Sequence, residues 1–164
     1  MIAGLVAGCR LAMPFAPAGG TRMNADRLVA IVRSVDPDAD RSEAIVSFTF
    51  RARHMLLLMD EDADRMRIIT PVAESASLAA GEPLRLLQAN FDTALDVRYA
   101  VARGKVWSAF LHPLGTLTEE ELRSGIAQVV ALAATYGGAY SSGGPVFRGG
   151  DSAERYERGA ARGE

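Results

Sequence analysis

The first element that the hydrophobic pattern predicts is an amphipathic helix over residues 23–35. Its apolar positions, which recur at helical spacing along one side, are Leu28, Ile31, Val32 and Val35. Asn24 or Asp26 can cap the start of this helix, since both side chains accept hydrogen bonds from free backbone N–H groups. Asp36-Pro37 ends it, because proline disfavours helical backbone in the residue before it.

Alternation of apolar and polar residues then predicts three strands in succession. Residues 44–51 form the first, with one face made by Val46, Phe48 and Phe50. Residues 54–59 form the second, which is apolar on both faces. The acidic loop 60–64 leads to a third strand over 65–70, which we expect to end at Pro71. Their short connections predict an antiparallel meander.

The second half of the chain predicts a helix, a hairpin and a last helix. Gly81-Glu82-Pro83 opens the helix, whose expected buried side is Leu84, Leu87 and Phe91. Residues 95–102 and 105–112 are strands of a hairpin turned by Arg103-Gly104. Thr118 and Glu121 then have capping-box spacing. The apolar side of the last helix consists of Leu122, Ile126, Val129, Val130 and Ala133, and Gly137 fits a left-handed stop.

The resulting order is α-β-β-β-α-β-β-α, in which strands come in hairpin-linked runs rather than in β-α-β alternation. Such an order favours an α+β fold with a mainly antiparallel, five-stranded sheet packed with helices. We expect one domain over 23–140, because this length and composition suit a single hydrophobic core.

Composition narrows the classes of function. The chain has 164 residues, 49% hydrophobic and 23% charged, with a formal net charge of −2. This balance provides no basic footprint for nucleic acid. No apolar run reaches the ~18 residues that span a bilayer, so we expect a cytoplasmic protein.

The two ends differ in composition from the middle. Residues 1–22 are rich in Ala, Gly and Pro and form either a disordered leader or sequence upstream of a true start at Met23. Val6-Ala7-Gly8-Cys9 resembles a lipoprotein processing box, but no basic residue precedes it. Membrane attachment is therefore expected only if Cys9 is lipidated. Residues 141–164 are Gly-rich and then charged, which predicts a disordered tail.

No group of residues has the spacing of a catalytic, metal or cofactor site. His54 and His112 stand at strand ends without metal-ligand partners at the usual spacing. The acidic loop 60–64 lacks the glycine and glutamate of a calcium loop. Ser141 and Ser142 follow a helix rather than the strand of a nucleophile elbow. We therefore expect no enzyme, no cofactor and no metal.

The sheet itself predicts a partner. The strand 54–59 and the strand 105–112 carry apolar residues on both faces, whereas a sheet with one dry face alternates. Either a partner covers the second face, or the second helix and the leader cover it within the chain. The candidate partner-binding residues are Phe48, Phe50, Leu56, Leu58, Trp107 and Leu111.

The chain resembles the type III secretion chaperones and the YbjN-like proteins over about 23–136. The resemblance rests on the element order, on Leu86-Leu87-Gln88-Ala89-Asn90-Phe91 and the following hairpin, and on His112-Pro113-Leu114 before the last helix. It implies a small homodimer that binds an extended stretch of another polypeptide along apolar surface, without ATPase activity. The alternative, implied by the YbjN-like relatives, is a regulatory module that acts by transient protein interaction.

Overall fold

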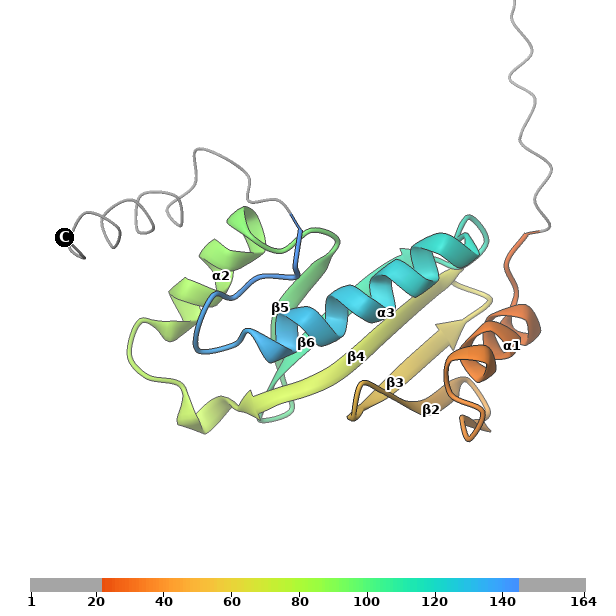
Figure 1. The fold of residues 1–164 in the computed structure, drawn as a ribbon, viewed down its shortest axis with the longest axis horizontal. Helices are drawn as coiled ribbons and strands as arrows, with labels where there is room; N and C mark the ends of the chain where they lie inside the picture. The colour runs from red at the N-terminus through yellow and green to blue at the C-terminus, as the bar shows by residue number, and fades with distance from the viewer. Residues whose placement is uncertain (1–21, 145–164) are drawn as a thin grey trace, which may run out of the picture.

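The computed structural model describes residues 22–144 and confirms the predicted order of the main elements (Figure 1). The elements are α1 (Ala25–Val35), β1 (Asp40–Ser42), β2 (Ile45–Phe50), β3 (Arg53–Asp60), β4 (Arg65–Glu74), a 3-10 turn (Ser75–Ser77), α2 (Glu82–Asp92), β5 (Val97–Ala102), β6 (Lys105–Pro113) and α3 (Glu119–Ala134). The leader with Cys9 and the tail beyond 144 lie outside the described residues.

The strands form one sheet in the order β1-β2-β3-β4-β6-β5, with every neighbouring pair antiparallel. The sheet has six strands rather than the expected five. The additional strand, β1, has three residues, all exposed and polar or charged, and pairs with the first half of β2. Its sequence carries no apolar alternation, which is why the pattern did not predict it.

The sequence pattern predicted that this strand ends at Pro71. In the structure, β4 continues past Pro71 to Glu74. Pro71 stands opposite Trp107 of β6, and the register shifts between Pro71 and Ala73. A proline is tolerated there because the ladder is already interrupted at the shift. The longer strand gives β6 a partner along its whole length, from Lys105 to Pro113.

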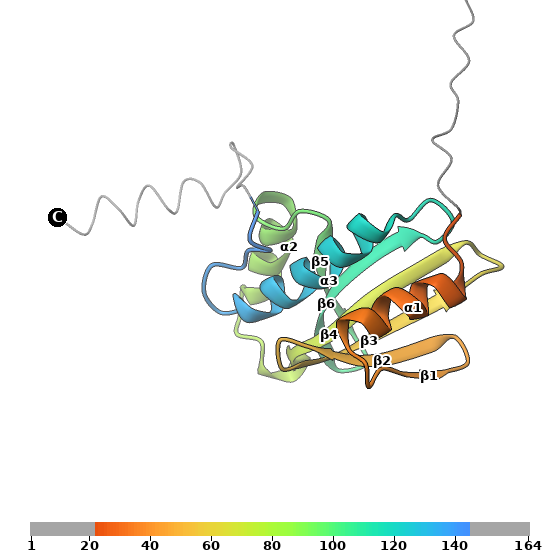
Figure 2. The same cartoon turned by 45° about the vertical axis from the view of Figure 1, so that its right-hand side comes forward.

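Helices α1 and α3 lie on the same face of the sheet, while α2 stands beside β5 at one end (Figures 1 and 2). Helix α3 is fastened to the sheet where Ser108 Oγ donates to the carbonyl of Val129 (2.9 Å) and Tyr99 Oη donates to that of Leu132 (2.7 Å). The core lies between this face and the two helices. Its largest fully buried side chains are Leu28, Val32, Val46, Met55, Leu57, Ile68, Val97, Val106, Leu122, Ile126, Val129 and Leu132.

Two helix starts follow the sequence signals. The Asn24 side chain accepts from the backbone N–H of Arg27 (2.9 Å) and caps α1. Thr118 and Glu121 form the predicted capping box of α3. All five residues expected on the buried side of α3 are buried, and Gly137 has the left-handed backbone of the predicted stop (φ +77°).

The predicted buried side of α2 is wrong. Leu84, Leu87 and Phe91 are 61%, 65% and 74% exposed, and the buried residues are Leu86, Ala89 and Asp92. The Asn90 side chain sets the rotation of this helix, because it accepts from the backbone N–H of Tyr99 (2.7 Å) and donates to the carbonyl of Tyr99 (3.1 Å). The helix is thus joined to β5 by polar contacts, and its larger apolar stripe faces outward.

The packed domain also runs past Tyr140. Ser142 is buried; its N–H donates to the carbonyl of Thr93 (3.2 Å), and its hydroxyl accepts from the N–H of Leu95 (2.9 Å). The Ser141 carbonyl accepts from Thr135 Oγ1 (2.7 Å). The first two residues of the expected tail therefore belong to the domain.

Candidate functional site

The sheet face opposite α1 and α3 is covered by no helix of residues 22–144 (Figures 1 and 2). We call it the open face and define it by its larger apolar residues, Ile45, Leu56, Leu58, Ile69, Trp107 and Leu111. The strand register brings these six together. Leu58 stands opposite Ile45, Leu56 opposite Ile69, and Leu111 opposite Arg67, which in turn faces Leu58. Four strands thus contribute large apolar side chains to this surface, which also carries Ser47 opposite Leu56 and Arg67 opposite Leu58.

The open face contains four of the six residues proposed from the sequence. Leu56, Leu58 and Trp107 are half-buried by their neighbours in the sheet, and Leu111 is 56% exposed. Phe48 and Phe50 lie on the other face: Phe48 is 2% exposed in the core, and Phe50 packs against that core. These two aromatic residues belong to the interior in this structure, and a partner on the open face does not reach them.

Sequence reasoning missed three residues of this surface, Ile45, Ile69 and Arg67. Ile45 and Ile69 have the strand parity of Leu56, so alternation contained the signal. Because β3 is apolar on both faces, alternation does not indicate which face of the sheet the helices cover. The missing information was the side on which α1 and α3 pack.

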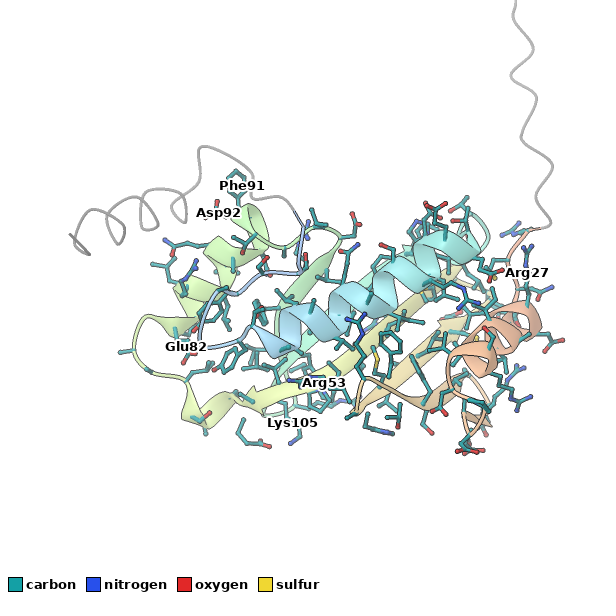
Figure 3. The ribbon with its side chains drawn as sticks, viewed as in Figure 1. Arg27, Arg53, Glu82, Phe91, Asp92 and Lys105 are labelled. Carbon is teal, nitrogen blue, oxygen red and sulfur yellow. The ribbon has the colours of Figure 1, made fainter. Side chains whose placement is uncertain are left out.

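A second exposed apolar surface lies on α2. The α2 stripe consists of Leu84, Leu87 and Phe91, and Figure 3 shows Phe91 on the outer side of the helix. Their spacing of three and four residues places them in one row. No charged residue of α2 falls within this row, since Glu82, Arg85 and Asp92 occupy other positions of the helix.

Aromatic and charged contacts hold the first turn of α2 against the segment after α3. The rings of Tyr99, Tyr136 and Tyr140 meet edge to face, with centroids 5.7–6.2 Å apart. A hydrogen bond from the Tyr136 hydroxyl lowers the pKa of the Glu82 carboxyl. Burial, with Glu82 nearby, raises the pKa of Tyr136 to about 12. These phenols stay neutral at physiological pH and act as hydrogen-bond donors.

A hollow of about 450 Å³ at the start of α3 gathers four titratable side chains, those of His112, Asp96, Glu120 and Glu121. The pKa of Glu121 is lowered there, chiefly by the backbone N–H of Thr118. That hydrogen bond is part of the capping box, so the shift has a structural cause. The His112 ring stacks on Phe110, with Nδ1 2.8 Å from the carbonyl oxygen of Pro113.

Residues 22–144 hold neither a metal-binding cluster nor a membrane-spanning helix. No group of three or more His, Cys, Asp and Glu side chains there is placed to hold a metal ion. None of the helices in this range is long and apolar enough to cross a membrane.

Comparison with known proteins shows which solved structures have a similar fold. No protein-family model matches the sequence, and no curated protein matches it. Among solved structures, one chain of the ExsC–ExsE complex matches with a TM-score of 0.52 at 19% identity, covering 66% of this chain and 89% of that one. The Yersinia pestis type III secretion chaperone SycH, in complex with a stable fragment of YscM2, matches with a TM-score of 0.50 at 12% identity, covering 66% and 98%.

The fold is that of a type III secretion chaperone. At these identities the likeness establishes the secretion-chaperone fold, including the helix–sheet–helix order and the antiparallel sheet.

Proposed function

We propose that this chain is a non-enzymatic, chaperone-like protein of the cytoplasm that binds an extended segment of a partner polypeptide on its open face. The observation that carries the proposal is the open face itself, an apolar surface on four strands that no described helix covers. Surfaces of this kind usually mark an interface in soluble proteins. The two matched structures support the proposal, since each is a complex with a second protein.

The open face carries charged residues and the α2 stripe does not, and this difference indicates which partner binds to each surface. A second copy placed on the open face by a two-fold axis would bring Arg65 and Arg67 near their own counterparts, which costs free energy. The α2 stripe carries no charge, so two copies can pair there without such repulsion. We therefore assign the partner segment to the open face and the homodimer to the α2 stripe.

The test of the proposed function compares two apolar residues of equal exposure. The full chain, tagged and expressed in its own host, should retain a partner polypeptide that mass spectrometry identifies. Leu111→Ser should weaken that binding about tenfold, because it removes one apolar anchor. Val101→Ser is the control, since Val101 is 57% exposed but lies outside the open face.

Three results would count against or redirect the proposal. Equal retention by both variants would remove the open face from partner binding. A full chain with no partner would favour cover of this face by the chain's own leader. A partner caught only after cross-linking would favour the regulatory alternative, which acts by transient contact.

A further inference from the structure

The centre of the open face holds a positive charge among apolar neighbours. Arg67 on β4 stands between Leu58 of β3 and Leu111 of β6, and Ile69 follows it on the same face. The Arg67 side chain is exposed, and its guanidinium makes no hydrogen bond or ion pair with any of residues 22–144. An arginine at this place interrupts an apolar row without a structural role in the described domain.

A hollow beside Arg67 is lined by both apolar and charged side chains. It measures about 640 Å³, and its walls include Leu58, Leu111, Arg65, Arg67 and Asp60, which stands opposite Arg65. The Asp60 carboxylate accepts from the backbone N–H of Ala63 (2.8 Å) in the turn. The hollow therefore offers apolar walls next to two guanidinium groups, of which that of Arg65 already donates to the carbonyl of Asp64 (3.0 Å).

Most of the other charged side chains on this face already form an ion pair or hydrogen bonds within the protein. Lys105 and Glu74 form an ion pair with each other. Arg98 donates to the carbonyls of Leu95 (2.5 Å) and Val97 (2.6 Å) at its own end of β5. Arg67 is thus the cation best placed to meet a ligand, although the whole chain has a net charge of −2.

We propose that the open face selects an extended partner segment in which carboxylates alternate with apolar residues. Such a segment directs every second side chain toward the sheet, roughly 7 Å apart. An apolar side chain enters the hollow beside Leu111 while a carboxylate two residues away meets Arg67 and Arg65. This inference rests on the proposed function and adds the chemistry of the partner.

The experiment uses three synthetic peptides with the repeat Leu-Thr-Xaa-Thr, where Xaa is Asp, Asn or Lys. Fluorescence anisotropy measures their binding to the full chain at low salt. The Asp peptide should bind about fivefold more tightly than the Asn peptide, as expected for an exposed ion pair. The Lys peptide should bind most weakly, and added salt should narrow the differences.

Substitutions then locate the preference. Arg67→Gln should make the Asp and Asn peptides bind equally, and Arg67→Glu should favour the Lys peptide. Arg33→Gln is the matched control, because it removes the same charge from α1, on the opposite side of the sheet, and should leave the preference intact.

The outcomes separate this inference from the proposed function. If all three peptides bind equally and Leu111→Ser weakens them together, the open face binds segments but the charge preference is refuted. A preference that persists in Arg67→Gln also refutes it. If no peptide binds, the open face is not a site for extended segments, and the proposed function fails with the inference.

Discussion

Asn90 shows how a single polar residue orients a whole helix. Its amide meets both backbone groups of Tyr99, one as acceptor and one as donor, in the manner of a neighbouring strand. The small Ala89 beside it is fully buried and lets α2 approach β5 closely. Two hydrogen bonds and one small residue thus determine that Leu84, Leu87 and Phe91 face outward.

At the same scale, Asp64 joins the loop between β3 and β4 to the segment before α3. Its carboxylate accepts from the backbone N–H of Gly115 (2.7 Å), which lowers its pKa from 3.8, with Arg22 (3.2 Å) contributing further. A carboxyl with a lowered folded-state pKa adds stability above its unfolded pKa, and this is lost as the pH falls through the folded pKa.

Asp64→Asn should therefore lower the free energy of unfolding at pH 7, and the difference from wild type should vanish in acid below the folded pKa of Asp64. Asparagine accepts the left-handed backbone at this position (φ +51°), so the substitution tests the charge rather than strain. Urea unfolding from pH 7 to strongly acid conditions measures it. Asp38→Asn, in an exposed turn, controls for the loss of one carboxylate; a difference that stays constant with pH would contradict the prediction.

At the scale of elements, the approach of α3 to β6 depends on Gly125. A Cβ at this position would lie 2.8 Å from Cδ1 of the buried Phe110 ring. Sequence alone favours alanine here, since glycine costs a helix interior about 1 kcal/mol. In the folded protein the clash dominates, because overpacking a core costs about 1–3 kcal/mol.

Gly125→Ala should therefore destabilise the domain by about 1 kcal/mol net in urea unfolding, despite the gain in helix propensity. Gly138→Ala, in the turn after α3, controls for the added methyl group, because the nearest atom to its Cβ is the carbonyl oxygen of Thr135 at an ordinary 3.7 Å. A more stable Gly125→Ala variant would show that Phe110 moves aside freely.

The elements also show how far the sequence predicts this structure. Within residues 22–144, periodicity predicted the three α-helices and five of the six strands, because each carries a regular apolar row. It did not find β1, which is short and polar. It predicted the wrong buried side for α2. The rotation of this helix is set by the hydrogen bond between Asn90 and Tyr99, which lie nine residues apart, and helical periodicity does not report such a contact. It also assigned Phe48 to a binding surface, because alternation does not tell which face α1 covers.

At the scale of the whole molecule, the two exposed apolar surfaces should act independently. If the α2 stripe pairs two copies, the wild-type melting temperature should rise with protein concentration, as mass action requires. Phe91→Ser should abolish that rise and yield a monomer in sedimentation equilibrium. Leu111→Ser should keep the dimer while binding the partner segment about tenfold more weakly. Loss of the dimer in Leu111→Ser alone would reverse the two assignments.

The two edges of the sheet affect how readily this protein aggregates at high concentration. On one side Asn90 and Arg98 bind main-chain groups of β5; on the other, β1 is three residues long and Asp36 accepts from the N–H of Thr49 in β2 (2.6 Å). Open edges are where sheets of different molecules join into growing fibrils. These contacts and the shortness of β1 reduce the number of main-chain groups that a strand of another molecule could pair with, so the protein can expose apolar area on a flat face and still resist polymerisation.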